Sequence, residues 1–405
     1  MGTLFLKFQE FVKGLANGST LGKDPRRLQF EADVNRLFLY TSYKSLGKNA
    51  DEKDAEEIIQ IAEKASVKDQ QKQVQENIHI QIKTFQATLD DILRPDLLGG
   101  NDDCKSSPQK HGTPRPSGLS FALGGPVAQT HKPAVPATRP LNHLELSSSF
   151  KVQSGYTLEL KPSEISHEDA GLGLFLSGSA DIGSVVAFYP GVIYSPAYYR
   201  YIPGYPRIDA QNPYLISRYD GTVIDAQPWG AGGEGREVWT GMVPPELRGK
   251  HESLGADSAS DRFWKILSKP LQGGIANGKD IVERRNPLAF GHYANHPSKG
   301  TAPNVMVCPY DFPMVEKNMR PYIPNISFGG KDNIQMKRFG SFWLKTGSSA
   351  EETTATGPVL RSLVLVSTRP ICDEELLLNY RLSNAKRRPA WYSSVDEEED
   401  KRRWG

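Results

Sequence analysis

The stretch GHYANHPSKGTAPNV, from Gly291 to Val305, places an Asn-His pair in a loop between two apolar, strand-like segments. Two prolines and a glycine follow the pair, and these residues favour turns over a helix or a strand. The side chains of Asn295 and His296 carry several polar atoms that need hydrogen-bond partners when they are buried. The loop therefore raises the question of what those partners are.

The composition of the chain restricts its class. A chain of 405 residues is long enough for two or three domains and at least one large core. Its 49 Lys and Arg residues nearly balance 47 Asp and Glu residues, for a net charge of +2, so we expect no direct nucleic-acid binding. Its three cysteines, Cys104, Cys308 and Cys372, are far apart. They favour a reducing intracellular compartment over a disulfide framework or a Cys-rich zinc site.

Targeting signals are weak. No run approaches the roughly 18 apolar residues that a transmembrane helix needs, so we expect no membrane association. A glycine follows Met1, but Leu6 occupies the position where a myristoylation signal has Ser or Thr. The first residues also fit poorly with a secretory signal. We therefore expect a soluble intracellular protein in the nucleus, the cytoplasm or both, and an organellar address stays open.

Residues 1–98 are expected to form a helical N-terminal region. Apolar side chains recur at helical spacing in three segments. The first has Phe8, Phe11, Val12 and Leu15; the second has Phe30, Val34, Leu37 and Phe38; the third has Ile78, Ile82, Phe85, Leu89 and Ile92. The third helix should end at Arg94, because Pro95 disfavours a helical conformation before it. Such a stripe favours packing within a helical bundle, with partner binding or a coiled coil as the alternative.

The remainder divides by composition into three parts. Residues 99–145 are rich in Pro, Gly and Ser and lack apolar periodicity, which is typical of a linker. Residues 146–392 hold short strand-like segments, interrupted at about 227–285 by a Gly-rich insertion with one candidate helix, ASDRFWKILSK. Residues 393–405 form a charged tail.

Several short segments favour strands joined by Gly and Pro turns. They are YTLELKP, SVVAFYPGVIY, GTVIDA, NPLAFGHYA, APNVMVCPY and VLRSLVLVSTRPI. No repeat with a period of 20–50 residues is present. Together with the helical N-terminus, this pattern predicts a β-rich α+β fold.

Three motifs are weak when each is considered alone. GLGLF, Gly171 to Phe175, lacks the third glycine of a dinucleotide-binding turn, so it indicates only a close backbone approach. His292 and His296 are four residues apart, but Tyr293 replaces the glutamate of a zinc-protease helix, so we expect no metal site. CDEELLLNYR, from Cys372, is compatible with a strand that ends in a buried tyrosine.

Four motifs in this order resemble the SET domain of protein lysine methyltransferases. They are GLGLF, FYPGVI, the Asn-His pair and EELLLNY. The block AGLGLFLSGSADIGSVVAFYPGVIY resembles the opening of that domain and DGTVIDA the strand that follows, while FGHYANHPSKGTAPN resembles its Asn-His loop and DEELLLNY its terminal signature. The resemblance covers about residues 161–383. Among these proteins, the insertion and the helical N-terminus resemble the group typified by SET domain-containing protein nine. The resemblance implies a β-rich fold of short strands, in which the terminal strand is threaded past the Asn-His loop in a pseudoknot.

The resemblance also implies S-adenosylmethionine as methyl donor, with no metal. On this interpretation the backbone of Gly171, Leu172 and Gly173 meets the donor, and a Cβ at either glycine would obstruct it. Asn295 and His296 match the pair that binds the donor, so we expect the donor to satisfy polar groups that the fold leaves open. Tyr380 would lie beside this pair.

Tyr380 matches the catalytic tyrosine of these enzymes, and Tyr189 matches a second tyrosine that shapes a channel for the substrate lysine. Val307 stands where some relatives have another channel tyrosine. The chain has no cysteine after Cys372, so it lacks the Cys-rich zinc cluster that closes the channel in several relatives. We expect Trp391 and Tyr392 to form an aromatic wall of the channel instead.

The resulting hypothesis is an S-adenosylmethionine-dependent protein-lysine N-methyltransferase acting on a histone or another protein. One alternative is a non-catalytic SET domain that binds a peptide or a partner, and another is transfer to a non-lysine acceptor. The expected partners are a lysine-bearing protein or peptide and, through the N-terminal helices, a further protein. The substrate, the target lysine and the degree of methylation stay open.

Overall fold

The computed structural model describes ten segments of the chain. They are residues 24–47, 51–95, 134–167, 169–196, 212–239, 280–328, 335–339, 342–346, 358–383 and 388–404. The helix expected near residue 12, most of the linker at 99–145 and the candidate helix at 259–269 lie outside these residues.

The first three helices of the described residues are α2 (Pro25–Ser45), α3 (Glu52–Lys64) and α4 (Val67–Leu93). Side chains that accept hydrogen bonds from the first turn cap each of them, from Asp24, Asp51 and Ser66. The stripe predicted for the third helix is buried along the whole of α4, and the helix ends at Leu93, one residue before the predicted stop. This part of the sequence analysis is confirmed.

A further helix, α5 (His143–Ser154), lies where the sequence analysis placed the end of the linker. The side chain of Asn142 accepts a hydrogen bond from the backbone of Glu145, and the Glu145 side chain accepts one from the backbone of Asn142. This reciprocal capping fixes the start of the helix. Gly155 ends it in a left-handed conformation, with φ of 87°. The Asn-x-x-Glu signal was present in the sequence and was missed.

Within the described residues, the strands form five small sheets. The first sheet has β1 (Tyr156–Pro162), β2 (Leu172–Ala180) and β14 (Ile371–Cys372), and the second has β3 (Val185–Tyr189), β13 (Val359–Ser367) and β9 (Val305–Pro313). The third has β10 (Asn325–Ser327), β4 (Gly191–Tyr194), β6 (Val223–Asp225) and β5 (Leu215–Ser217). Two sheets are strand pairs: β7 (Arg236–Val238) with β8 (Ile281–Glu283), and β11 (Gln335–Phe339) with β12 (Phe342–Thr346). All neighbours are antiparallel except β10 and β4. The predicted α+β class is confirmed.

One strand prediction was wrong. NPLAFGHYA forms turns and then the short 3-10 helix η2 (Gly291–Tyr293). Side chains along most of this segment are buried, but the backbone is held locally. Ala289 and Tyr293 donate to the carbonyls of Asn286 and Phe290, three residues earlier in each case. An apolar run buried on all sides gives no periodicity to separate a strand from such turns.

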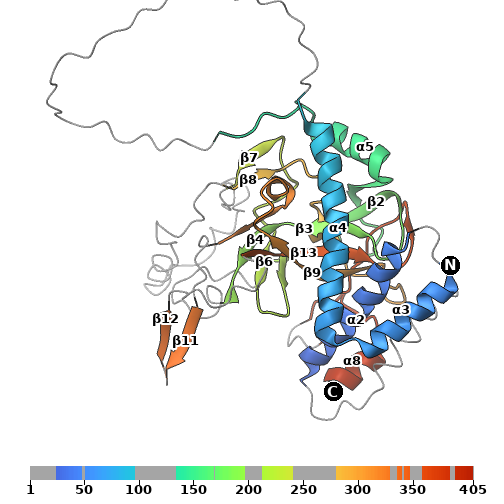
Figure 1. Cartoon of the computed structure of the whole chain (residues 1–405). Helices are drawn as coiled ribbons and strands as arrows, with labels where there is room; N and C mark the ends of the chain where they lie inside the picture. Colours follow the sequence, from blue (N-terminus) through green and yellow to red (C-terminus); the bar gives the residue numbers. More distant parts are fainter. Residues whose placement is uncertain are drawn as a thin grey trace, which may run out of the picture.

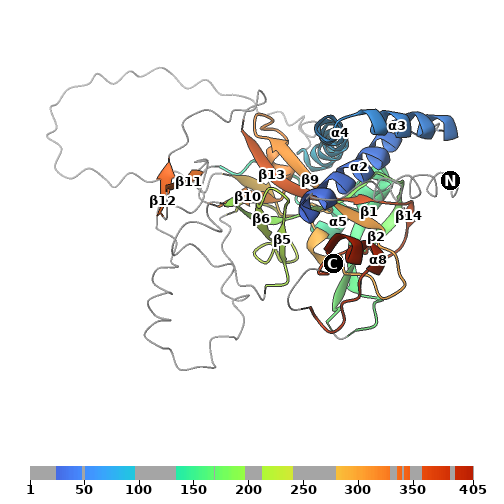
Figure 2. The same ribbon diagram turned by 90° about the horizontal axis from the view of Figure 1, so that it is seen from below.

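The helices and the strands share one hydrophobic core. Figure 1 shows α4 running across the β3–β13–β9 sheet, with α2 and α3 beside it, and Figure 2 shows the same layers from below. Apolar side chains of α2, α4, α5 and the three-stranded sheets belong to a single buried cluster. A second, smaller cluster surrounds Trp229 and Trp239. The predicted stripe therefore packs against the sheet as well as against other helices.

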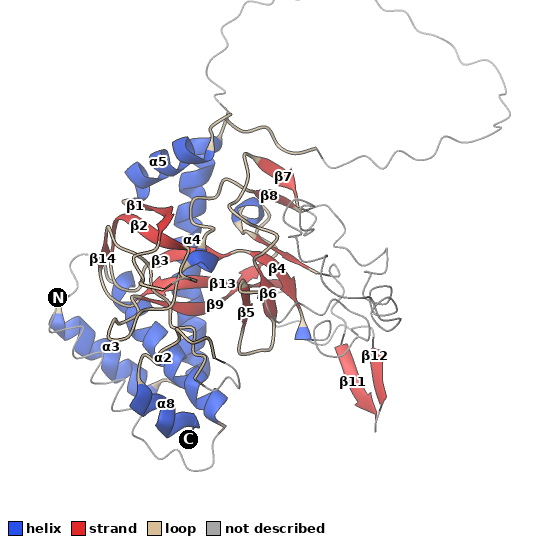
Figure 3. Cartoon of the chain, turned by 180° about the vertical axis from the view of Figure 1, so that it is seen from behind, coloured by secondary structure: helices blue, strands red, loops and turns tan. Residues whose placement is uncertain are grey.

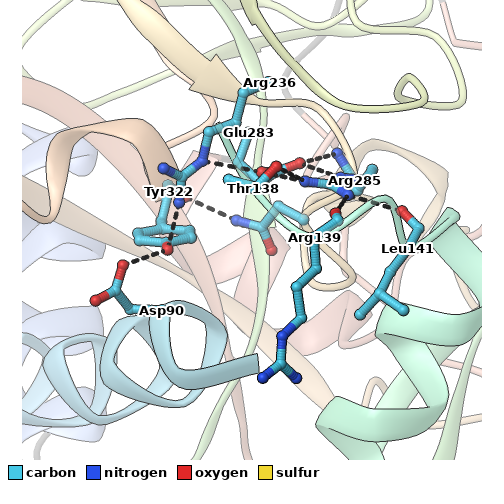
Figure 4. A network of polar contacts seen from close by, with 9 residues as sticks. Asp90, Thr138, Arg139, Leu141, Arg236, Glu283, Arg285 and Tyr322 are labelled. Carbon is cyan, nitrogen blue, oxygen red and sulfur yellow. Dashed lines mark hydrogen bonds and ion pairs between the residues drawn. The ribbon is translucent and has the colours of Figure 1, made fainter. Parts of the chain in front are cut away.

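A buried polar network fastens the end of α4 to the β7–β8 region (Figure 4). Glu283 is fully buried and pairs with Arg236 at 3.1 Å and Arg285 at 2.7 Å. Arg236 also donates to the hydroxyl of Tyr322, which donates to Asp90 of α4 at 2.9 Å. Arg285 further donates to the backbone carbonyls of Arg139 and Leu141 and to the hydroxyl of Thr138. The network thus fixes the chain where it re-enters the fold before α5.

The last described helix, α8 (Glu397–Trp404), lies in the segment predicted as a charged tail. Figure 3 shows it beside α2, and an ion pair at 3.6 Å joins Glu399 of α8 to Arg36 of α2. Among the described residues, no helix is both long and apolar enough to cross a membrane.

Candidate active site

The candidate site forms where the segment after β14 crosses the Asn-His loop. On one side of this segment Leu376 donates to the carbonyl of Leu174 in β2, at 2.7 Å. On the other side Leu378 donates to the carbonyl of Asn295, at 2.8 Å. Parallel bridges join Asn295 to Leu377 and Val305 to Leu378. The segment therefore lies between β2 and the loop, which is the crossing that the resemblance predicts.

Asn295 ties the loop to the glycine motif. Its side-chain amide nitrogen lies 3.1 Å from the carbonyl of Ala170, 3.2 Å from that of Leu172 and 3.3 Å from Oε1 of Glu375. Glu375 is buried and also accepts from the hydroxyl of Ser163, at 2.6 Å. The predicted convergence of the first and third motifs is thus present, through a carboxylate to which the sequence analysis gave no role.

His296 has partners on both ring nitrogens. Nε2 lies 2.8 Å from the carbonyl of Ser393, so Nε2 carries a hydrogen and donates it. Nδ1 then accepts from the backbone N–H of Tyr380, at 3.3 Å. Burial lowers the pKa of His296, so the ring is neutral at pH 7. The fold itself supplies partners for both ring nitrogens, and binding of the donor by this pair stays a prediction.

Tyr380 lies against the Asn-His pair. Its hydroxyl donates to the carbonyl of Ala294 at 3.0 Å, and its ring centre is 5.5 Å from that of His296. About 37% of the residue is exposed, yet the phenol is largely enclosed, and this burial raises its pKa to about 12. The hydroxyl therefore stays protonated at pH 7, and its oxygen keeps lone pairs that can accept a further hydrogen bond.

The glycine motif differs from the expectation at one of its two glycines. A Cβ on Gly173 would lie 2.2 Å from Oε1 of Glu375, so this glycine is required for contact with the protein's own carboxylate. Gly171 has φ of 54°, and nothing lies within 4 Å of the position that its Cβ would occupy. Leu172 between them is 47% exposed. Open space beside Gly171 is compatible with a ligand that approaches the backbone there.

Trp391 and Tyr392 lie beside the pair, as the aromatic-wall hypothesis requires. The ring of Tyr392 stacks on that of His296, with centres 4.6 Å apart, and its hydroxyl accepts from the backbone of Leu382 at 3.0 Å. The ring of Trp391 is 6.2 Å from Tyr380 and stacks on His167 at 4.7 Å. Their place is therefore as predicted, and their role in a channel stays a prediction.

Tyr189 is buried at the end of β3. Its hydroxyl donates to the carbonyl of Tyr214 at 2.9 Å, and burial raises its pKa well above the ordinary value. The ring of Tyr214 lies 5.7 Å from His292 and 6.2 Å from Tyr293. These residues form an aromatic cluster, which we call the tyrosine cluster (Tyr189, Tyr214, His292 and Tyr293). The sequence analysis found only Tyr189, because Tyr214 is joined to it by a backbone contact across 25 positions.

Val307 has a different position from the other proposed site residues. It lies in the middle of β9, opposite Leu365 of β13, and its partly buried side chain packs against the hydrophobic core. The structure therefore assigns it a place in the sheet. A role in lining a substrate channel stays a prediction.

The threaded segment, the Asn-His loop and the glycine motif meet at one crossing in a β-rich α+β protein. SET domain-containing protein 9 of Pongo abelii is 29% identical to the chain over 164 residues, which is 39% of this chain and 48% of that protein. The human protein of the same name has the same identity over 164 residues and is covered to 44%. The chain thus matches less than half the length of each relative.

No family profile matches the chain. The partial similarity to two proteins named for a SET domain supports a distant relation to that family.

Proposed function

We propose that the chain is a protein-lysine N-methyltransferase that uses S-adenosylmethionine. The observation that carries the proposal is the meeting of Tyr380, the Asn295–His296 pair and the 171–173 backbone at one crossing, through hydrogen bonds of 2.8–3.3 Å. The partial similarity to SET domain-containing proteins supports it independently. When bound, the donor would supply an electrophilic methyl group on a positively charged sulfur.

The chain's own residues suit this chemistry. We assign the donor to the open side of Gly171, with backbone groups of Gly171, Leu172 and His296 as its contacts. A lysine amine must be neutral to attack, although its pKa in water is about 10.4. A nearby positive sulfur would disfavour the ammonium form, so the amine would lose its proton once the donor is bound. The Tyr380 hydroxyl donates its hydrogen to the carbonyl of Ala294. Its oxygen would therefore orient the amine by accepting a hydrogen bond from an N–H of the amine.

A second candidate function is a non-catalytic module that binds a peptide. One observation favours it: the side chains of Asn295, His296 and Tyr380 all have hydrogen-bond partners within the protein. The fold alone would then account for these residues. In that case the crossing is a stable scaffold, and the substrate or partner would be held without methyl transfer.

Two measurements on the full chain separate these functions. Calorimetric titration with S-adenosylmethionine measures donor binding, and transfer of a tritiated methyl group to a lysine-centred peptide pool and a protein library measures turnover. For the enzyme we expect both, with Tyr380→Phe retaining donor binding and losing at least tenfold in transfer. Tyr310→Phe, which removes a phenol hydroxyl that contacts His79 of α4 outside the crossing, is the matched control. Donor binding with no transfer to any substrate would favour the module.

A further inference from the structure

His292 differs from its neighbour His296 in having a ring nitrogen without a partner. It lies in η2 and is 8% exposed. Its Nε2 is 3.0 Å from the carbonyl of Gly230, and a carbonyl oxygen only accepts, so Nε2 carries the hydrogen. Nδ1 is then the acceptor of a neutral ring. Among the described residues, nothing donates to this buried atom.

The ring of His292 is surrounded by the aromatic residues of the tyrosine cluster. The centre of the ring lies 4.4 Å from that of Tyr293, 5.7 Å from Tyr214 and 6.2 Å from Tyr189. The hydroxyl hydrogen of Tyr189 is committed to the carbonyl of Tyr214. Burial lowers the pKa of His292 to about 4, so the ring is neutral at pH 7 and Nδ1 keeps its lone pair.

A buried acceptor without a donor costs free energy, and an active site is one place where a ligand supplies the missing partner. The missing ligand must present an N–H or O–H to Nδ1. It must also suit an aromatic enclosure, and a primary ammonium group meets both conditions. It carries three N–H donors, and aromatic rings attract a cation through their faces.

We propose that Nδ1 of His292 accepts a hydrogen bond from the side-chain amine of the substrate lysine within the tyrosine cluster. This inference rests on the proposed methyltransferase function and adds a substrate-binding residue to it. His292 acts as an acceptor that orients the amine. It does not act as the base, because a group with a pKa far below that of lysine does not remove the proton at neutral pH.

The acceptor role has a consequence for substrate preference. Each methyl group that the amine gains replaces one N–H, and a quaternary ammonium has none. The positive charge and the apolar chain persist in the quaternary form, so aromatic attraction is retained while the hydrogen bond to His292 is lost. A primary amine and its quaternary analogue therefore distinguish the His292 contact from binding to the rings alone.

The first test measures the ring nitrogens of the full chain, labelled with ¹⁵N-histidine, by NMR at pH 7.5. We expect Nε2 of His292 to be protonated and Nδ1 to be bare. Addition of n-butylammonium, a mimic of the lysine side chain, should shift the Nδ1 resonance, whereas butyltrimethylammonium should leave it in place. A proton on Nδ1 in the free protein, no shift with either probe, or equal shifts with both would overturn the proposal.

The second test exchanges the two hydrogen-bonding functions of the ring. His292→Asn retains an acceptor near the Nδ1 position, whereas His292→Gln retains a donor that can reach Gly230. Steady-state methyl transfer to the lysine-centred peptide pool gives the readout, with calorimetric affinity for S-adenosylmethionine as control. We expect the Gln variant to raise KM for the peptide at least tenfold with donor affinity unchanged, and the Asn variant to stay within about threefold of the parent.

The opposite ranking, with Gln active and Asn impaired, would assign His292 a structural role through Gly230 and overturn the proposal. If the parent chain transfers no methyl group to any substrate, the proposed function fails. The NMR titration still decides the inference in that case, because it requires no turnover.

Discussion

Gly173 lies so close to Glu375 that any side chain at this position would collide with the carboxylate. The carboxylate cannot simply move aside, because it accepts hydrogen bonds from the Ser163 hydroxyl at 2.6 Å and from the backbone of Glu164 at 2.9 Å. Oε1 of Glu375 also accepts a hydrogen bond from the side-chain amide of Asn295, at 3.3 Å. A single methyl group at Gly173 should therefore disturb the link between the glycine motif and the Asn-His loop.

We expect Gly173→Ala to lower the free energy of unfolding by about 1–3 kcal/mol, the usual cost of overpacking a buried position. Gly235→Ala is the matched control, because nothing lies within 4 Å of its Cβ position. Gly171→Ala should cost about 1–2 kcal/mol through its left-handed backbone alone. Urea denaturation measures all three. Equal stability of the Gly173 and Gly235 variants would show that Glu375 moves freely.

Single residues also mark the limit of what the sequence reveals. The family resemblance implied that Tyr380 lies beside Asn295 and His296, and in the structure Tyr380 is hydrogen-bonded to His296 and Ala294. The sequence analysis could not reveal Glu375 as the partner of Asn295, because the two are 80 positions apart and an acid beside an apolar run is equally compatible with an edge strand. It also treated His292 only as half of a metal pair, since its partner is a backbone carbonyl 62 positions away.

At the scale of elements, the helix α2 forms an ion pair with Arg381, the residue that follows Tyr380. Asp33 of α2 is 3% exposed and forms a two-point ion pair with the guanidinium of Arg381, with one contact at 2.7 Å. Arg381 has a left-handed backbone, with φ of 54°. The hydroxyl of Tyr219 also donates to Asp33. The N-terminal helices thus fix the backbone that carries the candidate catalytic tyrosine.

We expect Asp33→Asn to lower the free energy of unfolding by about 1–3 kcal/mol, because it removes the charged hydrogen-bond partner of Arg381, whose side chain is 35% exposed and stays in contact with water. Glu31→Gln in the same helix is the control. Its ion pair with Arg27 joins neighbouring turns of α2, and the arginine side chain is 73% exposed. We expect that substitution to cost no more than about 0.5 kcal/mol. Guanidinium unfolding at pH 7 gives both values.

The same pair predicts a pH dependence. Burial alone would raise the pKa of Asp33, but the charge and hydrogen bonds of Arg381 outweigh it, so the pKa is lowered. A lowered carboxyl pKa contributes stability above the ordinary value near 3.9, and this contribution is lost as the pH falls through the folded-state pKa. Unfolding free energies measured from pH 7 to pH 3 should fall more steeply for the parent than for Asp33→Asn. Parallel curves would contradict this assignment.

The network around Glu283 joins α4, β7, β8 and the segment before α5 (Figure 4). We expect Glu283→Ala to lower the free energy of unfolding by about 3–5 kcal/mol, because Arg236 and Arg285 would keep buried charges without a carboxylate. Glu76→Ala on α4 is the control, since its carboxylate is 52% exposed and its partner Lys72 is 78% exposed. That variant should lose no more than about 1 kcal/mol. Equal losses, measured by urea denaturation, would argue against the network.

Elements were predicted where their pattern is local. The α4 stripe appears in the sequence and in the structure, because it depends on a repeat that a helix imposes. β1 forms where a strand was predicted, but its burial decreases along the strand and does not alternate. The segment 286–294 was misassigned because its side chains are buried on all sides, which removes the alternation. Its conformation depends on Asn286, which donates to the carbonyl of Tyr322, 36 positions away. No local pattern contains that contact.

For the whole molecule, the shared core makes the N-terminal helices part of the same folding unit as the β sheets. Ile82 of α4 is fully buried in the cluster that also contains β3, β9 and β13. The exposed surface of the helices is then the part that is free for a partner. A partner-binding role for this region stays a prediction, and the stripe first considered for it is used in packing.

This arrangement predicts a single unfolding transition for helices and sheets. All six tryptophans lie after residue 98, so their fluorescence reports on the later part of the chain, whereas α2, α3 and α4 contribute strongly to far-UV circular dichroism. We expect Ile82→Ala to destabilise the protein by about 2–5 kcal/mol and to shift both signals to the same lower urea midpoint. Ile80→Ala, two residues along α4 and 62% exposed, should change neither midpoint appreciably. If the dichroism moved while the fluorescence midpoint stayed in place, the helices would fold as a separate unit, and α2 would not be the support on which Arg381 and Tyr380 depend.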